Sequence, residues 1–82
     1  MNNSFYNDFA ARFAASTLTS LVESFNSQVG NRGFNSVRAA HDKALIDELV
    51  RRGIDVSAVF DGTVISFAHH VELDNNSLVI RK

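Results

Sequence analysis

Three alternating apolar runs, separated by two tight-turn signals, fill residues 55–80 and constrain the fold more than any other part of the sequence. The dipeptide Asp61-Gly62 is typical of a two-residue type I′ hairpin turn, and the run 74–77 (DNNS) is a second turn signal. Apolar runs bounded by such turns are typical of paired antiparallel strands. The pattern therefore predicts a three-stranded antiparallel meander with strands at about 55–60, 63–73 and 77–81.

The two turns also predict which residues face one another. A two-residue turn at Asp61-Gly62 places Phe60 opposite Thr63, and a turn tip at the two asparagines pairs Val71 with Ile80. A slip of one residue would turn the apolar side chains to water, so the register should be well defined. Both turns place the same apolar residues of the middle strand on the core face: Ile65, Phe67, Val71 and Leu73.

Apolar residues at helical spacing precede the meander. Phe5, Phe9 and Phe13 follow one another at i, i+4 and share one flank of a helix that begins near residue 4. Later apolar residues lie on a stripe well away from that flank. We expect a helix over about 4–29 that is either kinked or broken near 16–20, where hydroxyl residues compete with the helix and a capping box begins at Ser20. If the helix is continuous, we expect its Phe flank to be buried against something other than this chain's own sheet, such as another chain.

A further helix is predicted over 36–53. Asn35 or Ser36 serves as its N-cap, and Gly53 followed by the hydrophobic Ile54 indicates a Schellman ending. Its apolar stripe should lie across the core face of the meander as a second layer. The expected fold class is therefore α+β, with N-terminal helices packed on a three-stranded sheet.

Composition indicates one small domain covering residues 1–82. A chain of 82 residues with 45% hydrophobic content is near the size at which one core just suffices. It contains no cysteine, so disulfides and thiolate metal sites are excluded. No apolar run is long enough to span a bilayer, and we expect a soluble, cytoplasmic protein. A formal net charge of −1 does not indicate a polyanionic partner.

Asp42 is anomalous because it falls within the apolar stripe of the 36–53 helix. A carboxylate there needs a partner, and Arg38, one turn earlier, can supply it. The adjacent His41-Asp42 dipeptide is similar to the metal-binding dyad of HD-type phosphohydrolases. The two side chains should project about 100° apart, however, and further ligands are not suitably placed. We therefore expect no metal and no cofactor.

The remaining candidate residues indicate three classes of function. Adjacent strand residues face opposite sides, so His69 should lie on the core face beside Ile54, and His70 on the outer face. An acid–base role for either histidine is one hypothesis, although no nucleophile or partner acid accompanies them. A second hypothesis is a nucleic-acid-binding regulator. It would use the basic residues of the 32–52 segment: Arg32, Arg38, Lys43, Arg51 and Arg52.

The arginines have a structural explanation as well. Asp47 with Arg51 and Glu48 with Arg52 form i, i+4 pairs on a face that should be solvated. The leading hypothesis is consequently a non-enzymatic protein-interaction module, either a homodimer or a subunit of a larger assembly, because the helices carry more apolar surface than a three-stranded sheet covers. The expected interaction surface consists of Phe5, Phe9, Phe13, Val79 and Arg81.

Overall fold

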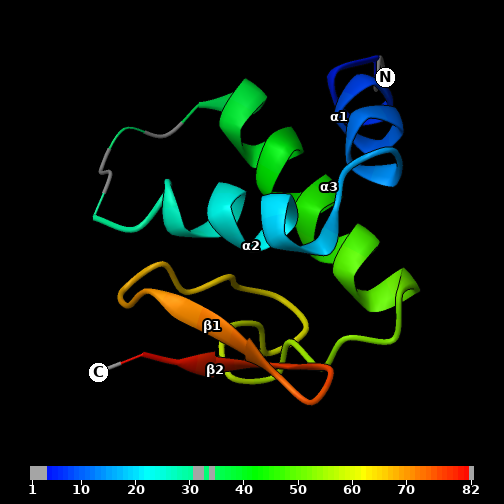
Figure 1. The fold of residues 1–82 in the computed structure, drawn as a ribbon. Helices are drawn as coiled ribbons and strands as arrows, with labels where there is room; N and C mark the ends of the chain where they lie inside the picture. Colours follow the sequence, from blue (N-terminus) through cyan, green and yellow to red (C-terminus); the bar gives the residue numbers. More distant parts are fainter. Residues whose placement is uncertain (1–3, 31–32, 34, 82) are drawn as a thin grey trace.

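Three helices are followed by a β-hairpin in the computed structural model, which describes residues 4–30, 33 and 35–81. Helices α1 and α2 both contact α3, and α2 also contacts β1 (Figure 1). None of the helices in these described ranges is long and apolar enough to cross a membrane. The elements are α1 (Ser4–Ala14), α2 (Leu18–Asn26), α3 (Ser36–Arg51), β1 (Val71–Asp74) and β2 (Ser77–Ile80).

The expected long N-terminal helix is broken rather than kinked. Helix α1 ends at Ala14 and α2 begins at Leu18. Thr17 is the N-cap of α2, and its side chain accepts a 3.1 Å hydrogen bond from the backbone N–H of Ser20. The break is therefore where the sequence predicted it, but the cap lies three residues before the predicted capping box.

Helix α3 begins and ends as its local signals predict. The side chain of Asn35 accepts a 2.8 Å hydrogen bond from the backbone N–H of Arg38. At the other end Gly53 has a φ of +80°, a conformation that side chains with a Cβ rarely adopt. The backbone N–H of Gly53 bonds to the carbonyl of Val50, and that of Ile54 bonds to the carbonyl of Leu49. These two bonds define a Schellman motif.

The second hairpin has the predicted register. Val71 of β1 pairs with Ile80 of β2 in an antiparallel ladder. Asn75 and Asn76 at its tip have φ values of +49° and +65°, and a type I′ turn requires positive φ at both central residues. Asparagine tolerates this region better than most residues do, so this turn follows from local chemistry.

The first predicted hairpin is wrong, and Asp61 is the reason. Only Gly62 in this turn has a positive φ, so a type I′ turn does not form. The Asp61 side chain accepts hydrogen bonds of 2.9 and 2.8 Å from the backbone N–H groups of Thr63 and Val64. This wider turn leaves Phe60 opposite Ile65 instead of opposite Thr63.

The three-stranded meander is therefore a two-stranded sheet in the structure. The middle strand shortens to β1, and residues 55–60 do not form a strand. Asp55 instead lies beside the start of β2 in a parallel bridge with Ser77. Its backbone N–H donates to the carbonyl of Asn76, and its carbonyl accepts from the backbone N–H of Leu78. Leu73, expected in the core, is 38% exposed.

The helix that packs on β1 is α2, whereas α3, expected across the whole core face, lies against the segment 60–67. The outward-facing backbone of Val71 is bonded at both its N–H and its C=O by the carboxamide of Asn26, at 2.8 and 2.9 Å. Asn26 thus takes the place that a residue of a third strand would occupy at this edge.

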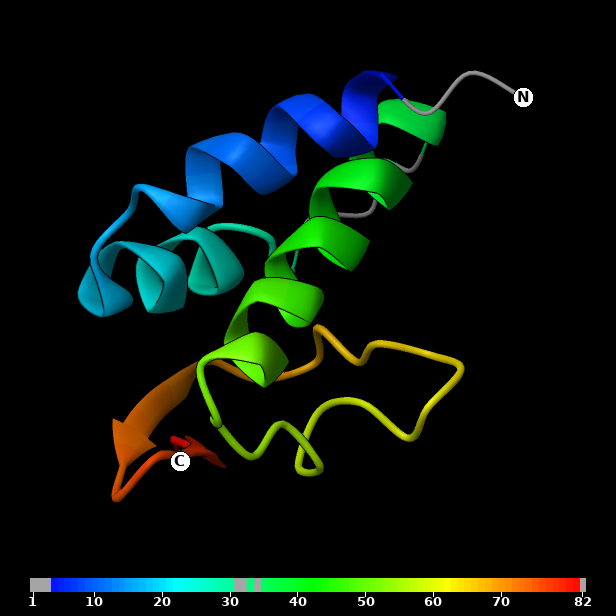
Figure 2. The ribbon, with the colours of Figure 1, turned by 90° about the vertical axis from the view of Figure 1, so that its right-hand side faces the viewer.

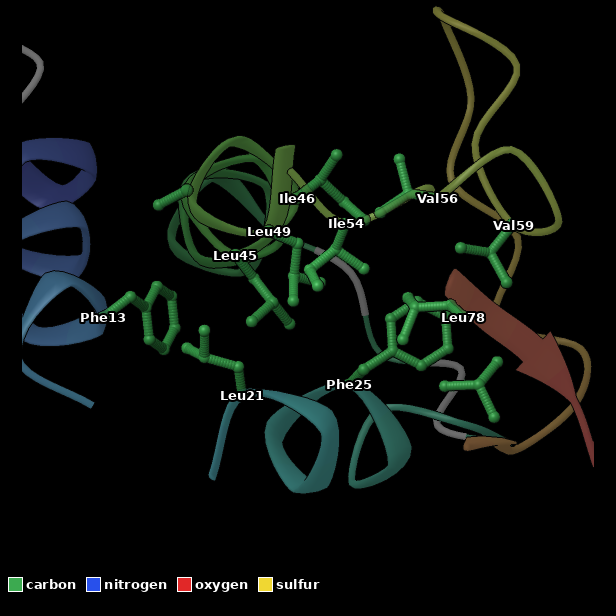
Figure 3. Close-up of a cluster of buried hydrophobic side chains, with 12 residues drawn as sticks. Phe13, Leu21, Phe25, Leu45, Ile46, Leu49, Ile54, Val56, Val59 and Leu78 are labelled. Carbon is green, nitrogen blue, oxygen red and sulfur yellow. The ribbon is translucent and has the colours of Figure 1, made fainter. Parts of the chain in front are cut away.

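The core lies between α1, α2 and α3 and continues toward the sheet. Figure 3 shows Phe13 of α1 at one end, Leu78 of β2 at the other, and Leu45 and Leu49 of α3 between them. Most of its members come from the predicted apolar stripes. The buried apolar residues are Phe13, Leu21, Phe25, Ala44, Leu45, Ile46, Leu49, Ile54, Val56, Val59, Val71 and Leu78.

The charged face of α3 is solvated only in part, because α1 covers the side that bears Glu48 and Arg52 (Figure 2). Glu48 is only 6% exposed. Its carboxylate accepts hydrogen bonds from Arg51 and Arg52, and Arg52 also donates to the carbonyl oxygens of Phe13 and Ser16 at 2.9 and 2.7 Å. Arg52 therefore neutralises a buried acid and satisfies carbonyls at the end of α1.

We expect Arg52→Met to lower the free energy of unfolding by about 3 kcal/mol, because it leaves Glu48 partly uncompensated and frees the carbonyls of α1. Arg51→Met is the matched control, since Arg51 also contacts Glu48 but is largely exposed. Arg51→Met should lower the free energy of unfolding by about 1 kcal/mol or less. Urea titration of both variants measures the difference, and equal losses would contradict this role for Arg52.

The stability of the α1–α3 contact should also depend on pH. Hydrogen bonds from Arg51, followed by those from Arg52, lower the pKa of Glu48 despite its burial. A depressed folded-state pKa adds stability above the unfolded carboxyl pKa of about 4.3, and this stability is lost as the pH falls further. The stability gap between the wild type and Glu48→Gln should therefore be largest near neutral pH and shrink in acid. A gap that stays constant or widens would overturn this assignment.

Candidate binding groove

A half-open groove lies between α3 and the segment 60–67. Its volume is about 740 Å³, within the range of ordinary ligand sites. In Figure 2 the segment extends away from the side of α3 that faces neither α1 nor α2. The groove is lined by six residues of α3 and six of the segment: Arg38, Ala39, Asp42, Lys43, Ile46 and Asp47, and Phe60, Gly62, Thr63, Val64, Ile65 and Phe67.

Backbone contacts hold the segment 60–67 in a closed loop. Phe60 and Ile65 form an antiparallel bridge, and the backbone N–H of Ser66 donates to the carbonyl of Val59 at 2.7 Å. Hydrogen bonds from the backbone N–H groups of Val64 and then Thr63 lower the pKa of Asp61. The loop tip therefore has a defined shape at neutral pH, and its Val64 is 62% exposed.

Aromatic and aliphatic side chains form most of the groove surface. The Phe67 ring packs against the ring of Phe25 from α2, tilted by 32° with the two centroids 4.7 Å apart, so the core fixes it from behind. The guanidinium of Arg38 lies 5.6 Å from the centre of the same Phe67 ring. Ile46 is buried, and Ile65 is partly buried against the core. This surface can accept apolar groups without exposing the core behind it.

Asp42 lies buried in the groove wall, and its predicted ion pair with Arg38 is confirmed. Its carboxylate oxygen lies 3.5 Å from Nε of Arg38. Arg38 also donates to the carbonyl oxygens of Gln28 and Gly33, which links the end of α2 to α3. The other Asp42 oxygen is 3.0 Å from Nδ1 of His41, a contact that the sequence analysis did not predict.

Helix α1 covers the far side of this charged cluster. The rings of Phe9 and Phe13 meet His41 edge-on, with centroids 5.1 and 5.2 Å away. Phe13 is 3% exposed, whereas Phe5 is 54% exposed. Of the three phenylalanines expected to face a partner, two therefore pack against this chain's own α3, and Phe5 is the exposed one.

Lys43 and Asp47 lie one turn apart on the rim of the groove. Lys43 Nζ is 3.2 Å from an Asp47 carboxylate oxygen, and the Lys43 side chain is largely exposed whereas that of Asp47 is partly exposed. The same carboxylate accepts a hydrogen bond from the hydroxyl of Tyr6 on α1. That bond, followed by burial, raises the pKa of Tyr6. Asp47 therefore pairs with Lys43 and Tyr6, and the predicted pair with Arg51 does not form.

The other predicted site residues are dispersed. Arg32 lies outside the described residues, and Arg51 and Arg52 serve the α1–α3 contact. On β2 and beyond, Val79 is partly buried and Arg81 is exposed. The basic residues proposed for nucleic-acid binding therefore do not gather on one free face within the described part of the chain, and that hypothesis stays a prediction.

The two histidines do not form a site with the groove. His69, expected on the core face beside Ile54, is exposed, as is His70. Within the residues that the structure describes, no group of three or more His, Cys, Asp or Glu side chains is arranged to hold a metal ion. An acid–base role for these histidines stays a prediction.

The groove was not predicted from the sequence, because it depends on the loop conformation of residues 60–67. The available signal was Asp61 itself, since aspartate commonly bonds to backbone N–H groups two or three residues later. Val64, an apolar residue beside that turn, was the second signal.

Comparison with known proteins identifies no relative. No protein family matches the chain, and neither a curated protein nor a solved structure matches it.

Proposed function

We propose that this protein is a non-enzymatic interaction module that holds apolar side chains of a polypeptide in the groove between α3 and the segment 60–67. The observation that carries this proposal is the exposure of Val64, at 62%, on the lip of a half-open and mostly apolar groove. A large exposed apolar side chain beside an apolar hollow is typical of a binding surface.

The polar groups of the groove support binding rather than catalysis. Asp42 is buried and engaged with both Arg38 and His41, so its charge is already compensated. Lys43 and Asp47 stay at the rim, where they can orient a partner without being desolvated at the centre. Recognition through such a surface uses an apolar centre and a polar edge.

The proposal changes the interaction surface predicted from the sequence. That surface included Phe9 and Phe13, which now form part of the intramolecular contact with His41. Phe5 remains exposed at the start of α1, Val79 lies on β2 and Arg81 follows β2, and none of the three lines the groove. The groove takes their place as the proposed centre of the interface.

A phage-displayed library of short linear peptides tests this function without a known partner. We expect selection on the wild type to enrich peptides that share apolar anchor residues. Val64→Gln should weaken their binding by about tenfold, because the apolar contact of one valine is lost without a change in charge. Isothermal titration calorimetry of a selected synthetic peptide measures the change.

Val50→Gln provides the matched control, since Val50 is 52% exposed on α3 but does not line the groove. Its peptide affinity should equal that of the wild type. Failure to enrich any apolar sequence, or equal weakening by both variants, would show that the groove is not a polypeptide-binding site.

A further inference from the structure

The rim of the groove carries one cation and one anion side by side on α3. Lys43 and Asp47 lie one helical turn apart on α3, and their side chains are 71% and 42% exposed. A twofold axis brings equivalent surfaces together, so residue i of one copy meets residue j of the other in both directions. Two α3 helices crossing in opposite directions would place Lys43 of each copy beside Asp47 of the other.

Lys43 can exchange partners at little cost. Its present bond to Asp47 joins two exposed side chains, and such pairs contribute little to stability. Asp47 is also fixed by the hydroxyl of Tyr6, so its carboxylate keeps a donor and its position when Lys43 moves away. The rim therefore presents one mobile cation and one anchored anion.

The loop tip at Val64, called here the Val64 lip, supplies an apolar contact beside the charged pair. Val64 is the most exposed of the large apolar side chains in the described ranges, and it stands at the edge of the groove. The side chain of Asp61 holds it there by accepting hydrogen bonds from the backbone N–H groups of Thr63 and Val64. A net charge of −1 gives little repulsion between two copies.

We propose that the occupant of the groove is a second copy of the chain, with the Val64 lip of each copy in the groove of the other and Lys43 of each paired with Asp47 of the other. This inference rests on the proposed function and names its partner. It requires only groups already on the surface, and it leaves the buried Asp42 cluster undisturbed.

A charge exchange on the rim tests the pairing directly. Sedimentation equilibrium at low salt should show a dimer for the wild type. Lys43→Glu alone and Asp47→Lys alone each place like charges together, and each should weaken association by about tenfold or more. An equimolar mixture of the two variants should associate again as a heterodimer, because each new charge then faces its opposite.

Three controls separate this pairing from a loss of folding. Thermal melting verifies that each variant is folded. Tyr6→Phe removes the hydroxyl that fixes Asp47 but keeps both rim charges, so its dimer should weaken by less than that of either charge variant. Val64→Gln should weaken the dimer, and Val50→Gln should not.

A wild type that remains monomeric at about 1 mM, or a mixture that fails to restore association, would overturn the self-pairing. The peptide selection gives an independent result. Peptides that still depend on Val64 would retain the proposed function while excluding the second copy as the occupant. Loss of both results would remove the groove as an interaction site.

Discussion

The buried carboxylate of Glu48 is the constraint on which the helical half of the molecule depends. A glutamate that is 6% exposed in a helix–helix contact must be compensated by nearby cations. Arg51 and Arg52 come from the last turn and C-cap of the same helix, so the compensation is built into the sequence of α3. Arg52 then reaches the end of α1, so one guanidinium fixes the relative position of two helices.

Because the end of α1 is fixed on α3, the position of α1 determines which faces of α3 stay uncovered. The face with Ala44 and Glu48 lies beside α1, and Figure 3 shows Leu45 and Leu49 on the face that points toward α2. The face that bears Ile46 remains for the loop of residues 60–67. Because α3 is covered on several sides, its acids Asp42 and Glu48 are buried, and arginines of the same helix and its C-cap compensate their charge. The groove is the place where this covering is incomplete.

Local chemistry determined which elements were predictable. The break before α2, the caps of α3 and the Asn75-Asn76 turn depend on neighbours within a few residues, and the sequence predicted their positions closely. The turn predicted at Asp61-Gly62 was wrong, because an aspartate can either enter a type I′ turn or accept hydrogen bonds from the backbone N–H groups that follow it. Two turns with equally strong signals thus adopted different conformations.

The burial of charged side chains was harder to predict than their ion pairs. This affected the prediction of the candidate site most. Glu48 with Arg52 follows the same i, i+4 rule whether the pair is exposed or covered by α1, so the spacing predicted the bond but not its burial. The same holds for the residues of α3 at the rim of the groove. Asp47 was expected to pair with Arg51, yet Tyr6 approaches from α1 and selects Asp47 as its acceptor. The position of α1 therefore determines which charges of α3 face the groove. Asp47, the partner of Lys43, is also held by Tyr6, so its position does not depend on Lys43.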